Sequence, residues 1–488
     1  MRKHVAAMIV VATVAVVAAG VAYKRRRDRQ WKQTQRILRR FARECATPVS
    51  KLWEVANSLV SAMEDSLNSK ENSTLHMLVS YVSSLPHGNE KGLYYGLNLR
   101  DTSFLILCAR LGGRNEPLSD LHRVEINIPS EILSGTSQEL FDFMAVEVAK
   151  FDSEHSGNDE KGDAGTEKKL GFTLSYPVDQ DVATTGSAIK WKRFSADDPV
   201  GNALVNDMNQ SLKKVGLNMH VFSLVADITG NLAGGKYYDL ETVAAVTLGS
   251  GTNAVYSEST EEIDRRNASS VPKSGEMVIS TEWYNFNCSH FPVTEFDAGL
   301  DSESLNPGTR IYEKLTSALY LGEIVRRVLL KVAQETALFG EDVPAKLSVP
   351  YVLSSPDMAA MHQDISEDQE VVSDKLREIF GITYCTPTAR KFVVEVCDIV
   401  AERGARLAGA GIVGIIKKLE RIEKKRSVVV VEGCLYEHYR IYRNYLHSSV
   451  WEMLGNELSD NVIVENCHGG SGAGAIFLAS CQSEDQKS

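Results

Sequence analysis

The sequence predicts a two-domain α/β protein that carries an N-terminal transmembrane helix. The chain has 488 residues with 43% hydrophobic content, which is more than one core of ordinary size needs. Two segments far apart in the chain, 92–111 and 243–256, share one pattern: an apolar run, a short polar turn and a second apolar run. We read them as hairpins of two domains that face a shared cleft. Residues 5–23 contain no charged side chain.

The uncharged segment predicts a membrane anchor. As a helix rising ~1.5 Å per residue, residues 5–23 would span roughly 28 Å, close to the thickness of a hydrocarbon core. Five basic residues at 24–29 outnumber Arg2 and Lys3, so the positive-inside rule places the body of the chain in the cytosol. A cleaved signal peptide is the alternative, but its apolar core is usually shorter and strong charge does not normally follow at once.

Charge and cysteine content exclude several classes of protein. The net charge is −11, although residues 24–43 hold ten Lys or Arg and one acid, so the rest of the chain is acidic. An acidic body argues against nucleic acid as a partner. The eight cysteines are scattered without a C-x-x-C pair, which predicts neither a zinc site nor a disulfide framework and fits a reducing compartment.

The body alternates between helical and strand-like segments. Residues 30–85 read as helices, because Leu52, Val55, Leu59 and Met63 recur at helical spacing. Further helices are predicted at 129–151, 201–217, 313–338 and 392–424, and a polar loop at 152–169. Strands are predicted in both hairpins, in "LGFTLSYPV", in "HVFSLVADITG" and in "SVVVVEGCL".

Two glycine-rich turns are candidate phosphate sites. In "GSGTN" at 249–253, glycines let backbone N–H groups face an anion, and Ser250 and Thr252 add hydroxyl donors. A hairpin turn without a ligand explains this turn equally well. "GGSGAG" at 469–474 enters a helix whose N-terminus could receive a nucleotide. A closely packed helix start is the alternative there.

Three acidic residues are candidates for chemistry. Asp227 follows an apolar strand and could act as a general base or as a helix N-cap. Glu282 and Glu313 lie beside aromatic residues and could accept hydrogen bonds from sugar hydroxyls, although the pattern around each acid, taken alone, favours a surface acid.

An ordered series of motifs carries a resemblance. It comprises "LGFTLSYPV", "AIKW", "GSGTNAVY", "KSGEMVISTEW", "ESLNPG", "YEKLTSALYLGEIVRRVLL" and "GSGAGA", and the match runs from about residue 35 to 480. The series resembles the hexokinases, most of all the plant membrane-anchored type. The resemblance implies the two-domain actin-like ATPase fold and transfer of the γ-phosphoryl group of Mg-ATP to the 6-hydroxyl of glucose or a related hexose.

The resemblance also implies boundaries and site residues, with Asp227 as the catalytic base. The predicted segments are an anchor and basic flank at 1–30, a helical segment at 31–92, a small domain at 93–226 and a large domain at 227–488. The implied sugar-binding residues are Ser175, Lys192, Arg193, Asp227, Asn253, Glu282 and Glu313. The implied ATP and phosphate contacts are Arg100, Asp101, Thr102, Gly249, Ser250, Gly251, Thr252, Ser355, Gly470, Ser471 and Gly472. No metal ligand is predicted from the protein itself.

The first phosphate turn departs from the family pattern. The family reads Leu-Asp-Leu-Gly-Gly-Thr-Asn-Phe-Arg where this chain reads "LNLRDTSFL" at 97–105. Asn98 replaces the Asp that helps to hold magnesium, and Leu105 replaces a phosphate-side Arg. Arg100 and Asp101 replace two glycines; at ~4 Å and an effective dielectric of about 20, one like-charge contact between Asp101 and ATP costs about 4 kcal/mol. Arg100 offsets this cost if it reaches the phosphate.

The sugar and nucleotide sides depart less. Ala226 replaces an Asn beside the base, Tyr284 replaces a Gly after the Trp, and Glu432 replaces an Asp. The segment Trp191–Phe194 is one residue shorter than the family's Trp-Thr-Lys-Gly-Phe, so that either Lys192 or Arg193 stands for the family Lys.

Two functions are compatible with a sequence that departs from the family strongly at the first phosphate turn and less at the sugar and nucleotide sides. In the first, the chain binds hexose but phosphorylates it weakly or not at all, and acts as a membrane-tethered sugar sensor or regulator with protein partners that the sequence does not identify. In the second, it is a fully active glucose or fructose kinase that uses ATP and releases ADP. The anchor implies an organelle surface that faces the cytosol, and the resemblance implies the mitochondrial outer membrane.

Overall fold

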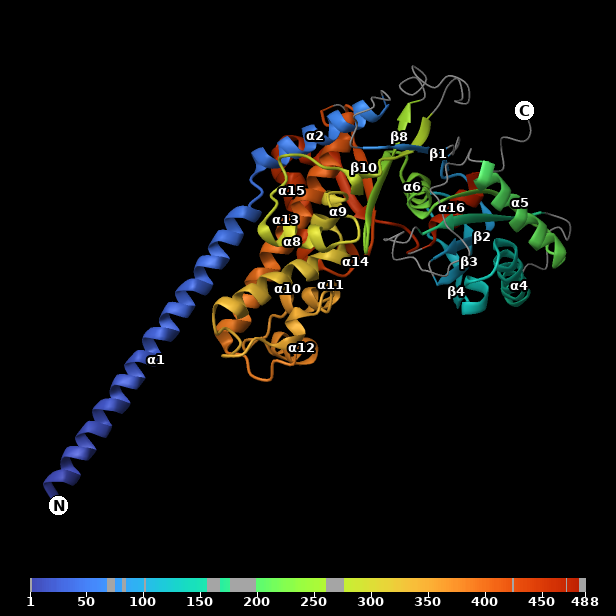
Figure 1. The fold of residues 1–488 in the computed structure, drawn as a ribbon. Coiled ribbons are helices and arrows are strands. Elements are labelled where there is room, and N and C mark those ends of the chain that lie inside the picture. Colours follow the sequence, from blue (N-terminus) through green and yellow to red (C-terminus); the bar gives the residue numbers. More distant parts are fainter. Residues whose placement is uncertain are drawn as a thin grey trace.

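The computed structural model of the chain describes residues 2–67, 75–80, 85–100, 102–155, 167–175, 199–259, 276–423, 425–470 and 472–481. Two separate sheets organise these residues, and each belongs to its own half of the body (Figure 1). The hairpins predicted at 92–111 and 243–256 are both confirmed, one in each sheet.

The five-stranded sheet has the order β4-β3-β2-β5-β6. Its strands are β2 (Gly92–Leu99), β3 (Ser103–Leu111), β4 (Ser119–Asn127), β5 (Lys168–Leu174) and β6 (Met219–Ala226). Strands β2, β3 and β4 are antiparallel, whereas β5 runs parallel to β2 and β6 runs parallel to β5. The carboxyl ends of β2, β5 and β6 therefore meet at one edge of the sheet.

The six-stranded sheet has the order β1-β9-β8-β7-β10-β11. Its strands are β1 (Leu78–Ser80), β7 (Thr242–Leu248), β8 (Thr252–Ser259), β9 (Glu276–Ser280), β10 (Ser427–Glu432) and β11 (Val462–Asn466). Strands β7, β8 and β9 are antiparallel, and β10 and β11 run parallel to β7. Apart from β1, this sheet repeats the strand order of the first.

Two helices lie between the sheets. α6 (Asp227–Tyr238) packs on β7 and β10 of the larger sheet, and α16 (Gly474–Cys481) packs on β2 and β5 of the smaller one. They touch each other through glycines: a Cβ atom on Gly474 would lie 2.4 Å from the carbonyl carbon of Gly230. Only residues without a side chain allow this backbone contact.

Helices cover the outer faces of both sheets (Figure 1). On the smaller sheet they are α3 (Ser130–Leu133), α4 (Ser137–His155) and α5 (Pro199–Lys214). In the other half they are α2 (Val49–Leu67), α8 (Glu295–Glu303), α9 (Ile311–Thr316), α10 (Ala318–Glu335), α11 (Ser355–His362), α12 (Glu370–Phe380), α13 (Pro387–Lys418), α14 (Cys434–Glu437) and α15 (Arg440–Leu458). Short 3-10 turns are η1 (Trp283–Asn285), η2 (Ala345–Ser348) and η3 (Ser459–Asn461).

The N-terminal helix α1 (Arg2–Cys45) projects from the body (Figure 1). Its last turns bury Ile37, Leu38 and Phe41, and Phe41 meets Phe296 edge to face at 5.3 Å between ring centroids. Among the residues whose side chains are described, no helix combines the length and the apolar character that crossing a membrane requires. The predicted anchor at 5–23 falls mostly outside that set, which leaves out the side chains of 2–20 and 23.

Three predicted elements differ from the structure. The helix predicted at 129–151 is divided into α3 and α4, with residues 134–136 between them. The helical prediction for 30–85 is wrong at Leu78–Ser80, which form a strand because they pair with β9. The helix predicted at 313–338 is broken at Ser317, whose backbone is extended. The break lets the amide of Ala318 donate a hydrogen bond to the Gly249 carbonyl at 2.8 Å. The segment boundaries predicted at 30, 92 and 226 stay predictions, although α16 returns from the end of the chain to the smaller sheet.

The glycine contact between α6 and α16 yields a test of the fold. We expect Gly474→Ala to destabilise the protein by about 1–3 kcal/mol, because its Cβ atom would meet rigid backbone rather than a flexible side chain. Thermal unfolding followed by circular dichroism measures this effect. Gly299→Ala in α8 is the matched control, since its Cβ atom meets only the end of the Arg327 side chain and Ala favours a helix. Equal unfolding temperatures for both variants would contradict the proposed contact.

Candidate active site

The predicted base lies where three strand ends meet. Asp227 is the first residue of α6, directly after β6, and Ala226 takes the N-cap position. Ser175 follows β5, and its hydroxyl donates a hydrogen bond to Asp227 Oδ2 at 2.6 Å. The amide of Ser175 donates to the Leu99 carbonyl at the end of β2. The structure therefore brings Ser175, Asp227 and the first hairpin together.

The environment of Asp227 raises its pKa. Burial is the main cause, because it disfavours the charged carboxylate. The Ser175 hydroxyl, the Ile228 N–H and the charge of Arg100 act in the opposite direction. A carboxylate with a raised pKa is a stronger base than an ordinary Asp, which suits a group that must accept a proton near neutral pH.

Polar side chains of the first hairpin bond to other groups of the protein. Arg100 Nη1 lies 2.8 Å from Glu125 Oε1, and Arg100 Nε donates to Asn98 Oδ1 at 3.1 Å. The Asn98 amide nitrogen donates to Thr173 Oγ1 at 2.9 Å, and Asn98 is 1% exposed. The Ser103 hydroxyl and the nearby Arg100 lower the pKa of Glu125, which keeps it charged. Arg100 would have to leave Glu125 to reach a bound phosphate.

Leu105 and the C-terminal glycine loop meet beside this hairpin. A Cβ atom on Gly472 would lie 2.7 Å from Leu105 Cδ2, so the leucine side chain lies directly against the loop. Gly469, Gly470 and Gly472 have φ values of 79°, 75° and 80°, which glycine adopts at no steric cost. Arg123 on β4 donates to the Gly469 carbonyl at 2.7 Å and joins the smaller sheet to the loop.

The second hairpin turns at Gly249–Gly251. The amide of Gly249 donates to the Gly251 carbonyl at 3.0 Å, and a Cβ atom on Gly249 would meet nothing closer than 3.9 Å. This open space at exposed backbone is what a phosphate group needs. Thr252 is buried, and its hydroxyl oxygen accepts a hydrogen bond from the Trp283 indole at 2.9 Å.

The predicted sugar-binding residues of the larger half form one cluster. Glu282 follows β9 and is 6% exposed, and its Oε1 accepts hydrogen bonds from Asn253 Nδ2 at 3.1 Å and Ser280 Oγ at 2.7 Å. Glu282 has a left-handed φ of 53°, a strained conformation of the kind that collects at functional sites.

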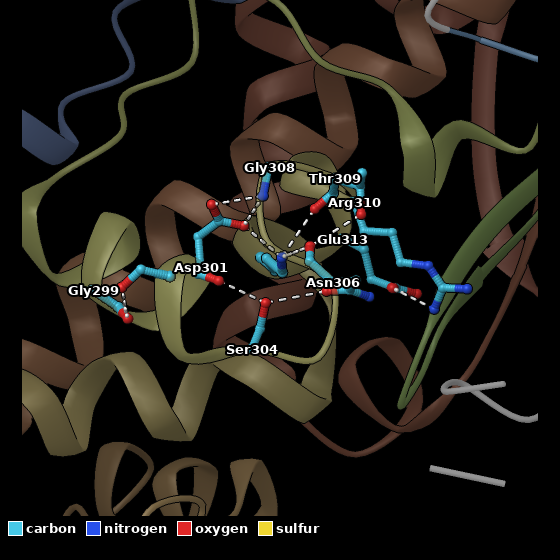
Figure 2. A network of polar contacts seen from close by, with 10 residues as sticks. Gly299, Asp301, Ser304, Asn306, Gly308, Thr309, Arg310 and Glu313 are labelled. Atoms are coloured by element: carbon cyan, nitrogen blue, oxygen red, sulfur yellow. Dashed lines mark hydrogen bonds and ion pairs between the residues drawn. The ribbon is translucent and has the colours of Figure 1, made fainter. Parts of the chain in front are cut away.

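A polar loop positions Glu313, the other predicted sugar-binding acid (Figure 2). The ammonium group of Lys314 lies 2.5 Å from Asp301 Oδ1 and donates to the carbonyls of Asn306 and Thr309 at 2.9 Å each. Asp301 also accepts from the Gly308 amide. These bonds fix the turn before α9, from which Arg310 and Glu313 project.

The nucleotide side is only partly as predicted. Ser355 is buried, and its hydroxyl donates to the Ala318 carbonyl, so a direct contact with nucleotide stays a prediction. Thr102 is exposed at the turn of the first hairpin, and Gly470 lies in the glycine loop. Four predicted contact residues lie outside the described residues: Asp101, Lys192, Arg193 and Ser471.

Several side chains that the sequence analysis did not predict as site residues lie at this site. Glu432 at the end of β10 accepts a hydrogen bond from Asn231 on α6, which fixes this helix to the larger sheet. The first hairpin is held by Thr173 and Glu125, and the glycine loop by Arg123. The predicted sugar side also contains Tyr284 and Arg310. Of these, only Glu432 and Tyr284 carried a signal, as departures from the motif pattern.

The site supplies few ligands for magnesium. Asn98 offers a neutral amide whose oxygen already accepts from Arg100, whereas magnesium prefers carboxylate and water oxygens. Within the described residues, no group of three or more His, Cys, Asp or Glu could hold a metal ion. Asn98, which stands where the family motif has an Asp, therefore does not fit a magnesium-holding role.

Comparisons with known proteins agree with the motif series. Two family models, both described as hexokinase, match residues 37–237 and 243–481. Hexokinase-1 of Nicotiana tabacum is 45% identical over 485 residues, which cover 98% of this chain and 97% of the relative. Hexokinase-1 of Arabidopsis thaliana is 45% identical over 492 residues, covering 99% of each.

Solved structures share the fold. A hexokinase from Schistosoma mansoni complexed with glucose is 27% identical, with a TM-score of 0.73 over 92% of this chain and 99% of that one. A second structure, described as a crystal structure of hexokinase, has a TM-score of 0.76 at 24% identity over 92% of this chain and 99% of that one. The predicted two-domain actin-like fold is confirmed.

The hydrogen bond from Ser175 yields a pH prediction. Because that bond stabilises the carboxylate, Ser175→Ala should raise the pKa of Asp227 further. Any reaction in which Asp227 accepts a proton needs the ionised form, so the acid limb of kcat/KM against pH should move to higher pH. Ser175→Thr keeps a hydroxyl and should leave the limb in place. A limb that stays fixed in Ser175→Ala would show that Asp227 is not the titrating group.

Proposed function

Since the chain belongs to the hexokinase family, we propose that it binds glucose or a related hexose together with ATP but transfers the phosphoryl group slowly. In the family reaction, a base takes the proton of the 6-hydroxyl while the γ-phosphoryl group of ATP moves to that oxygen. The contact between Asp227 and Ser175 and the open second hairpin support retained binding and a retained base.

One observation carries the proposal of slow transfer. Arg100, the cation of the first phosphate turn, is held by Glu125 and Asn98, and Leu105 fills the adjoining place with an apolar side chain. Phosphoryl transfer depends on positioning and on neutralising the phosphate charge. Each ~1.4 kcal/mol of lost transition-state stabilisation is a tenfold loss of rate. ATP would meet an Arg100 whose guanidinium is already paired within the protein.

The alternative is a fully active glucose or fructose kinase. It is favoured by the position of Arg100, whose charge acts on Asp227 and which could turn from Glu125 to the phosphate when ATP binds. Glu125 is half exposed, so its ion pair with Arg100 is of the kind that contributes ~1 kcal/mol or less. A coupled assay of the full chain with glucose and ATP separates the two proposals.

We expect turnover well below that of ordinary hexokinases, with glucose binding measurable by calorimetry. Rebuilding the first turn with Asn98→Asp, Arg100→Gly, Asp101→Gly and Leu105→Arg should then raise kcat at least ~10-fold, because it restores a phosphate cation and a closely approaching backbone. Asp227→Asn in the rebuilt chain is the control and should abolish the gain. An unchanged kcat would place the limiting lesion at Ala226, beside the base.

We also propose that the chain is anchored by residues 5–23 in a membrane, with its body in the cytosol, and acts there as a sugar sensor or regulator. The mitochondrial outer membrane is the proposed location. The uncharged segment and the basic residues that follow it support the anchor. The projection of α1 from the body also supports this proposal (Figure 1).

The anchor is tested in cells with fluorescent fusions. The full chain should colocalise with a mitochondrial outer-membrane marker and resist extraction by carbonate, whereas a chain lacking residues 1–30 should become extractable. Protease added to intact organelles should remove the body. Protection of the body from protease would contradict the orientation, and a second membrane marker would correct the organelle.

A further inference from the structure

Tyr284 touches the centre of the proposed sugar site. It lies in η1, two residues after Glu282, and its hydroxyl donates to Glu282 Oε2 at 2.5 Å. The other oxygen of this carboxylate accepts from Asn253 and Ser280. Both oxygens of Glu282 therefore hold protein donors. A hydroxyl at 2.5 Å from a carboxylate makes a charge-assisted bond, which is among the stronger hydrogen bonds in proteins.

Arg310 holds the Tyr284 ring in this position. Its guanidinium carbon lies 5.1 Å from the centroid of the ring, a cation–π distance. Its Nη1 lies 3.6 Å from Glu313 Oε2, and Arg310 is 17% exposed in its side chain. The φ of Arg310 is 53°, so it shares the strained left-handed conformation of Glu282. The two predicted sugar-binding acids thus each face a side chain of this Tyr–Arg pair.

Resting on the hexose binding proposed above, we propose that Tyr284 determines sugar specificity. Its hydroxyl takes the place at Glu282 that one hydroxyl of a hexose would otherwise occupy. A site that must bond a hydroxyl rejects an analogue lacking it, because its buried polar groups are left unpaired. Here the protein pairs that oxygen itself, so the site accepts a hexose that lacks the hydroxyl about as well as glucose.

The test compares the full chain with Tyr284→Phe. Phenylalanine keeps the ring over Arg310 and removes the hydroxyl that donates to Glu282. Binding of glucose and of its 2-, 3- and 4-deoxy analogues is measured by calorimetry, and the fluorescence of the adjacent Trp283 gives a second readout. Tyr384→Phe, at a tyrosine that is 78% exposed and far along the chain, is the matched control.

Two results are expected together. In the wild-type chain, one deoxy analogue should bind within about twofold of glucose. In Tyr284→Phe, glucose should bind about tenfold tighter, because its hydroxyl can now donate to Glu282, and the same deoxy analogue should fall about tenfold behind glucose. Tyr384→Phe should behave as the wild type.

The outcomes distinguish this inference from the function on which it rests. If Tyr284→Phe binds glucose no tighter than the wild type, or if the ranking of the deoxy analogues does not change, Tyr284 only supports Glu282 and the inference is overturned while hexose binding stands. If neither chain binds any hexose although both unfold at the same temperature, the proposed function fails and the inference fails with it.

Discussion

The backbone contact between Gly230 and Gly474 sets the geometry on which the site depends. α6 begins with Asp227, and α16 begins directly after the glycine loop at 469–472. Because the two helices touch without an intervening side chain, the base and the loop are fixed relative to each other. Each helix also packs on a different sheet, so the same contact joins the two halves of the body. One residue along α6, the bond between Asn231 and Glu432 fixes this helix to β10 of the larger sheet.

Within this frame, the two hairpins offer very different surfaces. The second hairpin leaves space at Gly249. Hydrogen bonds from the Ala318 amide and the Trp283 indole stabilise its turn. In the first hairpin, Asn98 and Arg100 already bond to protein groups, Asn98 to Thr173 and Arg100 to Glu125. Under the proposed function, recognition of a phosphate chain rests mainly on the half that carries the second hairpin.

Local sequence patterns allowed much of the fold to be predicted. The features that were not predicted depend on contacts between residues far apart in the chain. Alternating apolar runs indicated both hairpins, and the order of the motifs indicated the two-domain architecture. The strand Leu78–Ser80 could not be predicted, because its conformation depends on pairing with β9, far along the chain. The break at Ser317 likewise depends on the hydrogen bond from Ala318 to Gly249. The bond from Arg123 to Gly469 joins residues 346 positions apart, and no local pattern marks it.

A single feature connects the phosphate side and the sugar side. Arg100 pairs with Glu125, Glu282 accepts from Tyr284, and Arg310 lies beside Glu313. In each case a charged group that would meet a ligand already meets a protein side chain. A ligand must then replace an existing contact rather than satisfy an open one, so part of its binding free energy is offset. Under the proposed function, the consequences differ between the two sides. At the hairpin the loss falls on charge that develops during transfer, and hence on rate. At Glu282 it falls on the bound hexose, and hence on affinity and sugar preference.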